Sequence, residues 1–374
     1  GANVGYIHSV QHSVPNQSTA ANSANLMYFT SSIAPIYPAY VRVVDANGNV
    51  VIKQDDRGHN AYDFGIPSND YGLNRPFMST ANPLAANQYD VLENGGDQLN
   101  ATFTADVNIT SFLKANVTST VNWGQTNYSN YSNPFYGSKV GVNGEINKQS
   151  TSALRTNNVQ TLTYFQDFDR HSVNVMVGHE YYKTTTKFLG AIAQGGFSPS
   201  IPEIDAFAKI SDASSYKSGY NVEGYFGSAQ YNYDQKYFAS ASFRRDASSY
   251  FAKENRWGNF WSVGGAWLIS KENFMQSSAS WLNMLKLKFS VGQQGNDNIG
   301  AYAYTDLYDL VPTGSTSMGA TFKRMGNPDI TWETTTNYNL GVEFSLWEGR
   351  LSGNVDYYVK KTSDLLFWLS IPES

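Results

Sequence analysis

Few side chains in this sequence are spaced for catalysis. In the segment GHEYYK, His179 and Glu180 could begin a helical zinc site, which needs a second histidine four residues after the first, on the same helical face. Position 183 is lysine instead, and the segment alternates as a strand does. We therefore interpret His179 as a strand residue at the rim or interior of a sheet, and we predict no metal site.

The segment FRRDASSYF holds two arginines, an aspartate and two serines where a strand passes into a loop. A serine nucleophile needs a positioned base, and none of the five histidines is near it in the sequence. We predict instead that an Arg–Asp pair fixes the root of the loop, and that the chain is not an enzyme. The glycine-rich GQQGNDNIG follows no strand–helix pattern, so it predicts turns and not a phosphate loop.

Aromatic side chains are the better candidates for ligand contact. Flat aromatic faces pack on sugar rings, while neighbouring amides bond hydroxyl groups. The segment NWGQTNYSNYSNPFYG combines both kinds of residue, and packing between loops or anchoring at an interface explains it equally well. The candidate contacts are Trp123, Tyr128, Tyr131, Phe135 and Tyr136. No residue is predicted to be catalytic, to hold a cofactor or to bind a metal.

Composition narrows the class of protein. Net charge is −5, from 26 Lys and Arg against 31 Asp and Glu, which gives no reason to expect nucleic acid as a partner. Charged residues make up 15 % of the chain, against roughly 25 % in soluble domains. Aromatics reach 15 % and cysteine is absent, which excludes thiolate metal sites and disulfides. Such a composition suits β-structure with wet surfaces.

Apolar and polar residues alternate along most of the chain, which is the signal of a β-strand with two different faces. The alternation predicts an all-β fold with about eleven antiparallel strands, each of about 10–17 residues. Their expected positions are 1–14, 97–109, 112–125, 156–168, 171–186, 217–234, 236–248, 257–270, 283–295, 333–347 and 350–363. The hairpin 337–361 raises the main question, because its apolar stripe could face a protein core or lipid.

The connections between these strands alternate in length. Long ones are expected at 15–96, 126–155, 187–216, 249–256 and 296–332. Short ones are expected at 110–111, 169–170, 235, 271–282 and 348–349. In a meander, all long connections then lie at one end of the sheet, as in outer-membrane barrels with long extracellular loops and short periplasmic turns. Aromatics near the strand ends, such as Trp261 and Trp347, favour interface girdles, so the apolar stripe is expected to face lipid.

Several segments together resemble the barrel of SusC-like TonB-dependent outer-membrane transporters of Bacteroidota (the RagA/SusC family). In order, they are IAPIYPAY with a later YDFG, MVGHEYYK, DQKYFASASFRRDASSYF, RWGNFWSVGGAWLISKENF, LKLKFSVGQQGNDNIG and GNPDITWETTTNYNLGVEFSLWEGRLSGNVDYYVKKTSDLLF. The resemblance covers essentially the whole chain. It implies that residues 1–374 are part of one 22-stranded transmembrane barrel, with the N-terminal extension, TonB box, plug domain and remaining strands outside this sequence.

The resemblance also implies a function. Such a barrel would import glycans or other oligomeric nutrients, with peptides as the other cargo, across the outer membrane of a Gram-negative bacterium. Its implied partners are a SusD-like surface lipoprotein, TonB–ExbB–ExbD acting through the plug, and membrane lipid, with a dimer of SusCD pairs also possible. No cofactor is implied. The alternatives are a passive porin or adhesin of the same membrane and a secreted all-β glycan-binding protein.

Overall fold

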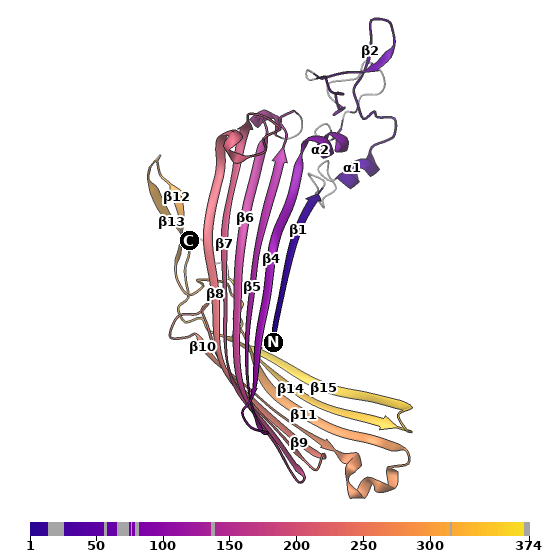
Figure 1. Cartoon of the computed structure of the whole chain (residues 1–374), viewed down its shortest axis with the longest axis vertical. Coiled ribbons are helices and arrows are strands. Elements are labelled where there is room, and N and C mark those ends of the chain that lie inside the picture. Colours follow the sequence, from indigo (N-terminus) through magenta and orange to yellow (C-terminus); the bar gives the residue numbers. More distant parts are fainter. Residues whose placement is uncertain are drawn as a thin grey trace.

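One antiparallel sheet of eleven strands forms the centre of the molecule (Figure 1). The computed structural model describes residues 1–369 except 14–25, 56–57, 66–74, 76, 79–81, 136–138 and 315. In spatial order the strands are β1 (Ala2–Ser13), β4 (Val91–Asn108), β5 (Leu113–Ser132), β6 (Glu145–Phe168), β7 (His171–Gly196), β8 (Phe207–Tyr233), β9 (Tyr237–Ser248), β10 (Trp257–Leu268), β11 (Leu282–Asn296), β14 (Glu333–Leu346) and β15 (Leu351–Ser363). All eleven predicted strands are confirmed, and each pairs with its neighbour in the predicted order.

Smaller elements interrupt the chain at two places. Between β1 and β4 lie α1 (Leu26–Ser32), the hairpin β2 (Arg42–Val44) and β3 (Val50–Ile52), and α2 (Pro83–Tyr89). Between β11 and β14 lies a second hairpin, β12 (Leu307–Pro312) and β13 (Met318–Arg324). The first hairpin turns at Asn47-Gly48, a dipeptide typical of tight hairpin turns, with Gly48 at a φ of 83°. The second hairpin was not predicted.

The connections sort by length as expected. One end of the sheet carries short turns, and the longest of them, between β10 and β11, holds the short 3₁₀ segments Ile269–Lys271 and Asn273–Ser278. At the turn between β8 and β9, Asp234 and Gln235 both have positive φ, 53° and 51°, which matches the right-handed twist of the flanking strands. The other end carries the two longest connections, 14–90 and 297–332, and the connections 133–144, 197–206 and 249–256. The 269–281 connection is the one exception to the sorting, because it is longer than these last three. This asymmetry is the one predicted for an outer-membrane barrel.

Two of the predicted long loops are wrong in extent. Residues 126–132 and 145–155 continue β5 and β6, and most of 187–216 continues β7 and β8. The strands β6, β7 and β8 reach 24, 26 and 27 residues, or about 80–90 Å at ~3.3 Å per residue. A bilayer needs only ~9–11 residues of a strand. The wall therefore extends far beyond a membrane on the side of the long loops.

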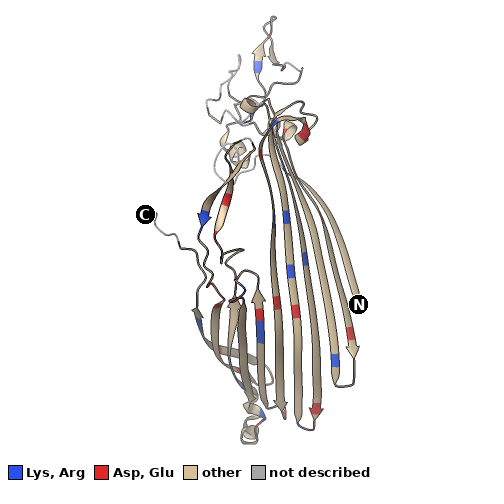
Figure 2. Ribbon diagram, turned by 90° about the vertical axis from the view of Figure 1, so that its left-hand side faces the viewer, with Lys and Arg blue, Asp and Glu red and all other residues tan. Residues whose placement is uncertain are grey.

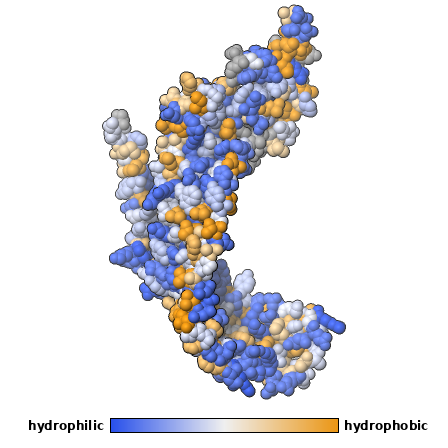
Figure 3. Space-filling model, in the orientation of Figure 1, coloured by the Kyte–Doolittle hydropathy of each residue, from blue (hydrophilic) through white to orange (hydrophobic). Residues whose placement is uncertain are grey.

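The sheet has two chemically different faces along its lower half. We call one the outer face; it is defined by apolar side chains that the register places on the same side of the strands, namely Val117, Leu162, Val177, Phe243, Val263, Phe289, Leu340 and Tyr357. We call the other the inner face; it carries Asn116, Thr161, Asn174, Gln230, Ser240, Ser290, Asn339 and Asp356. Figure 3 shows hydrophobic residues gathered part-way down the molecule.

Among the described residues, the two clusters of buried apolar side chains both lie near the loop end. Phe251, Ile299 and Ala303 form one small buried cluster, against which Trp332 and Ile330 pack. This cluster joins the β9–β10 loop to the long β11–β14 connection, and Trp332 Nε1 donates to the Arg256 carbonyl at 2.8 Å. A second cluster lies where the β7–β8 connection folds against β5 and β6. The sheet itself has no core of its own, as expected of a barrel wall.

Candidate functional site

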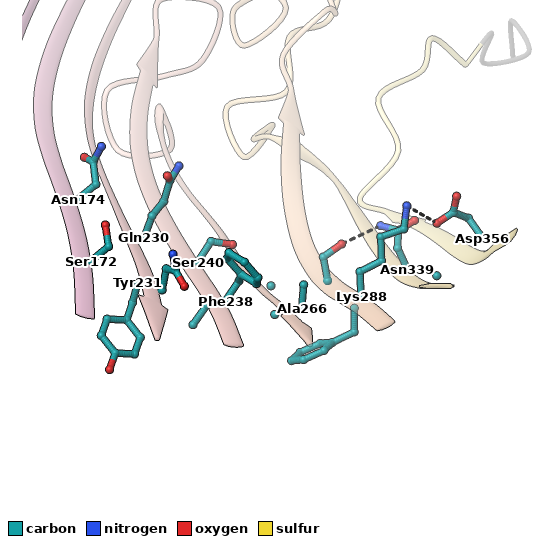
Figure 4. A pocket seen from close by; sticks show the side chains of 17 residues that line it. Ser172, Asn174, Gln230, Tyr231, Phe238, Ser240, Ala266, Lys288, Asn339 and Asp356 are labelled. Atoms are coloured by element: carbon teal, nitrogen blue, oxygen red, sulfur yellow. Dashed lines mark hydrogen bonds and ion pairs between the residues drawn. The ribbon is translucent and has the colours of Figure 1, made fainter. Parts of the chain in front are cut away.

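The inner face is hollowed at its lower end, near the short turns. A hollow of about 710 Å³ spans the strands from β7 to β15 and is lined mainly by Asn, Gln, Ser and Gly residues (Figure 4). Its only charged pair is Lys288 with Asp356, 3.1 Å apart. Asn339 Nδ2 donates to Ser290 Oγ at 3.3 Å nearby. Neutral hydrogen-bonding groups thus dominate this surface, which suits contact with water or a polar solute.

A charged network lies higher on the same face. Arg244 Nε donates to both carboxylate oxygens of Asp246 at 2.8 Å, and its Nη2 donates to Glu180 at 2.8 Å. Asn157 Nδ2 donates to the other oxygen of Glu180 at 3.0 Å. The predicted Arg–Asp pair is confirmed, and β6 and β7 are joined to it. The network borders a second hollow of about 610 Å³ on the inner face.

Aromatic rings continue up the inner face beyond this network. Phe188 stacks on Tyr216 with ring centres 5.1 Å apart and planes inclined by 20°. Tyr182 lies 6.0 Å from Tyr220, which lies 4.4 Å from Tyr250. We call these five residues the aromatic ladder. Flat rings of this kind, spread over two strands and a loop, can pack on sugar rings or on peptide side chains.

Asp297 holds the lower end of the ladder in place. Tyr220 donates its hydroxyl hydrogen to Asp297 at 2.6 Å, and Ser248 donates to the same carboxylate oxygen. Burial, followed by the charge of Asp297, raises the pKa of Tyr250 in the β9–β10 loop, so its hydroxyl stays protonated at neutral pH. The segment GQQGNDNIG thus positions the ladder as well as forming the predicted turn, in which Asn298 N–H donates to the Asn296 side chain at 3.1 Å.

The predicted aromatic contacts are scattered. Tyr128 lies on the inner side of β5, whereas Trp123 and Tyr131 lie on the other side of the same strand. Tyr131 is 3 % exposed in the cluster with Ile146 and Phe207. Phe135 packs edge-on against Tyr89 at 5.6 Å, and Tyr136 lies outside the described residues. Ligand contact by these residues stays a prediction.

The aromatic ladder was not predicted because β7 was expected to end too early, before Phe188, and β8 to begin too late, after Tyr216. A signal was present: Tyr216 and Tyr220 are four residues apart, and Tyr182 and Phe188 are six apart, so extended strands would put each pair on one face. Assigning 187–216 to a loop removed that periodicity.

His179 makes only ordinary contacts. Its Nδ1 lies 2.9 Å from Gln160 Oε1 and its ring lies 4.8 Å from the ring of Tyr225. Within the described part of the chain no group of three metal-ligating side chains is found. Every helix among the described residues is too short or too polar to cross a bilayer.

Comparison with known proteins gives the family. The sequence model described as "TonB dependent receptor-like, beta-barrel" matches residues 44–374. The chain is 31 % identical over 244 residues to the TonB-dependent receptor P26 of Formosa agariphila, covering 63 % of this chain and 24 % of that protein. It is 36 % identical over 172 residues to the TonB-dependent receptor SusC of Bacteroides thetaiotaomicron, covering 44 % and 17 %.

A solved structure agrees with these relatives. The structure of the RagAB peptide transporter superposes with a TM-score of 0.74 at 26 % identity, over 84 % of this chain and 35 % of that one. The chain therefore spans only about a third or less of the proteins it matches. With the register, the loop asymmetry and the family model in agreement, this chain belongs to the TonB-dependent receptor-like β-barrels, a family of outer-membrane receptors and not of enzymes.

Proposed function

We propose that this chain forms part of the channel of a TonB-dependent importer that takes oligomeric nutrients, glycans or peptides, across the outer membrane of a bacterium of the Bacteroidota. The two-faced sheet carries the proposal, since an apolar outer face suits lipid and a polar inner face suits a wet lumen. The relatives from Formosa and Bacteroides support the bacterial group.

The rest of the barrel belongs to the same proposal. The matched proteins are about three to six times longer than the stretch this chain covers. We infer that residues 1–374 are part of one barrel of 22 strands, and that the gene also encodes an N-terminal extension, a TonB box and a plug domain. Proton-driven TonB–ExbB–ExbD would then act on the plug, and the wall described here would stay rigid.

The loop end fits a lipoprotein partner. The long strands raise the loops well clear of the bilayer, and the β12–β13 hairpin exposes the large apolar side chains of Leu310 and Phe322. We propose that a SusD-like lipoprotein covers this end, and that two such pairs assemble together. The neighbour RagAB is named a peptide transporter, which favours peptide as cargo, while the aromatic ladder suits sugar rings equally.

Growth and uptake test this function. The gene that encodes this chain would be deleted from its host, and growth would be compared on single glycans and on peptide mixtures. We expect one class of nutrient to be lost, and uptake of it to stop when the proton gradient is collapsed. Uptake that persists without the gradient would contradict the proposal and favour a passive porin. A protein found soluble outside the cell would favour the secreted β-protein.

The partner has its own test. The tagged protein, extracted in mild detergent, should be far heavier than 41.4 kDa and should carry a surface lipoprotein identifiable by mass spectrometry. Isolation of a chain of this mass, alone, would contradict the lipoprotein and the longer barrel together.

A further inference from the structure

A basic groove lies on the outer face of the long strands, above the apolar half of the sheet. Lys183 and Lys187 on β7 and Lys217 on β8 all have exposed side chains. They line a groove of about 540 Å³, which they share with Trp123, Ser152, Leu154, Thr156 and Thr185. Figure 2 shows basic residues part-way along the long strands. Every one of these residues lies on the outer face by register.

The charge of this groove is not neutralised within the protein. Lys187 lies directly opposite Lys217 in the β7–β8 register, and like charges in that position destabilise a sheet. Across the described residues, none of the groove lysines forms an ion pair. Glu223, the carboxylate that the register places diagonally from Lys183, is bonded to Tyr225 at 2.8 Å and lies 3.4 Å from His179.

Several other lysines of the same sheet are paired. Lys114 lies 3.0 Å from Asp106, Lys288 lies 3.1 Å from Asp356, and Lys148, which is also on the outer face, lies 2.5 Å from Glu203. Lysines elsewhere in the described sheet, such as Lys209 and Lys286, also form no ion pair, so what distinguishes the groove is that three unpaired lysines lie close together. An external anion with more than one negative group would satisfy the three lysines together.

The height of the groove limits which anion can reach it. Tyr225 and His179 are paired in register just above Val177 of the outer face, and we take this pair as the upper edge of the apolar band. Lys183 is four residues above His179, and Lys187 and Lys217 are eight residues above this pair. At ~3.3 Å per residue and a tilt of ~40°, these steps correspond to about 10 and 20 Å above the interface. Ordinary phospholipid headgroups end below this level, whereas a lipid with a large charged saccharide reaches it.

The floor of the groove suits a sugar. Trp123 presents an indole ring beside Leu154, which is its register partner on β6. Ser152, Thr156 and Thr185 add hydroxyl groups around the ring. Stacking on an indole, hydroxyl donors and three cations together match a phosphorylated saccharide better than a simple anion.

We propose that this groove binds the phosphorylated core saccharide of lipopolysaccharide in the outer leaflet of the membrane. The proposal depends on the outer-membrane location of the family and not on the transport activity. The groove lies on middle strands of the sheet, away from both of its edges, so closure of a barrel leaves it on the outside. Bound lipopolysaccharide would then stabilise the part of the long strands that extends above the bilayer.

Binding can be measured on the whole protein purified from outer membranes in mild detergent. The probes are rough lipopolysaccharide with a phosphorylated core and the same lipid after enzymatic dephosphorylation, each followed by native mass spectrometry. We expect K183Q/K187Q/K217Q to bind the phosphorylated lipid roughly 10- to 100-fold more weakly than the wild type. Dephosphorylation of the lipid should weaken wild-type binding to a similar degree.

Matched variants separate charge in the groove from charge in general. K114Q/K236Q/K323Q removes the same total charge elsewhere and should bind like the wild type. K183R/K187R/K217R keeps the cations and should also bind, which shows that the fold tolerates substitution at these sites. A shift of the unheated protein on denaturing gels confirms a folded barrel in each case.

Three results would overturn the proposal. The first is equal lipopolysaccharide binding by the glutamine variant and the wild type. The second is displacement of the lipid by millimolar inorganic phosphate, which would make the groove a general phosphate site. The third is a protein whose co-purification depends on the three lysines, which would make it a protein interface. Nutrient uptake by the glutamine variant should be unchanged, so failure here is distinguishable from failure of the import function.

Discussion

Arg244 joins two strands through one guanidinium group. It contacts Asp246 on its own strand and Glu180 on β7. The Arg244 side chain is 36 % exposed, whereas the Asp246 side chain is only 11 % exposed. Loss of the arginine would therefore leave a largely buried carboxylate without its charged partner, which is the costly part of breaking such a pair.

Arg244→Ala should lower the free energy of unfolding by about 1–2 kcal/mol. Urea unfolding of the detergent-solubilised protein, followed by tryptophan fluorescence, measures this. Arg245→Ala is the matched control, because Arg245 is on the outer face and its contact is with the ring of Trp257, 5.0 Å away. This substitution should lower the free energy of unfolding by less than about 1 kcal/mol. Equal losses for both variants would show that the network adds nothing specific.

Tyr216 is the most accessible ring of the aromatic ladder, at 58 % exposure. If the ladder contacts cargo, Tyr216→Ala should weaken binding of the imported nutrient about 2- to 10-fold, since one aromatic contact contributes ~0.5–1.5 kcal/mol. Leu189→Ala is the control, because Leu189 is 64 % exposed on the opposite face of the same wall. Isothermal titration with the nutrient found by the growth test measures both, and identical affinities would remove the ladder from the binding surface.

What the sequence could predict at this scale depends on distance along the chain. Arg244 and Asp246 are two residues apart on a strand, so they share a face whatever the strand pairs with. The contact of Arg244 with Glu180, and that of Tyr220 with Asp297, need the register between separate strands. Register follows from whole-sheet pairing, which local alternation does not determine.

Strand number was predictable and strand length was not. The apolar–polar alternation that marks the strands exists only where one face meets lipid. Above the membrane both faces of β6, β7 and β8 are wet, and polar residues such as Lys148, Gln149 and Lys187 obscure the alternation. Polar strand extensions therefore look like loops in the sequence, which is why 126–155 and 187–216 were misassigned.

The β2–β3 hairpin has a carboxylate at its turn. Hydrogen bonds from the backbone N–H groups of Asn49 and Asn47 lower the pKa of Asp45. A lowered pKa in the folded state means that this stabilisation is present above the unfolded value of about 3.9 and is lost as pH falls below it.

Amide hydrogen exchange of residues 42–52 should therefore be slower, relative to the intrinsic rate, at pH 5 than at pH 3. Asp45→Asn keeps an acceptor oxygen without the titrating group, so the difference between the two pH values should shrink in that variant. Unchanged protection of the wild-type hairpin across this range would mean that Asp45 does not stabilise the turn.

The loops over the shorter strands form a packed cap. A Cβ atom at Gly295 would fall against the ring of Phe260, which in turn packs on Trp332 at 5.3 Å. Gly295→Ala should displace this ring and speed proteolysis of the β11–β14 connection several-fold. Gly5→Ala on β1 meets no atom within 4 Å and should leave proteolysis unchanged. Equal cleavage of both variants would show that the cap tolerates the added methyl group.

As a whole, the molecule is a β-sheet whose outer face is apolar and suits lipid, and whose inner face is polar and suits water. Short turns, long loops, alternating faces and the family model all agree with that description. The fold class could be predicted from the period-two alternation of apolar and polar residues alone, whereas the cargo depends on loop and ladder geometry that this alternation does not encode.

The sidedness of this wall can be measured directly in reconstituted bilayers. This chain has no cysteine, so single cysteines can be introduced along β11 and β14 at Val291, Phe289, Leu340, Ser290 and Asn339 and labelled with nitroxides. At Val291, Phe289 and Leu340 the label should be relaxed mainly by oxygen dissolved in lipid. At Ser290 and Asn339 it should be relaxed mainly by a water-soluble nickel chelate. Equal access of both reagents at all five positions, or the reverse pattern, would contradict a membrane-spanning channel wall.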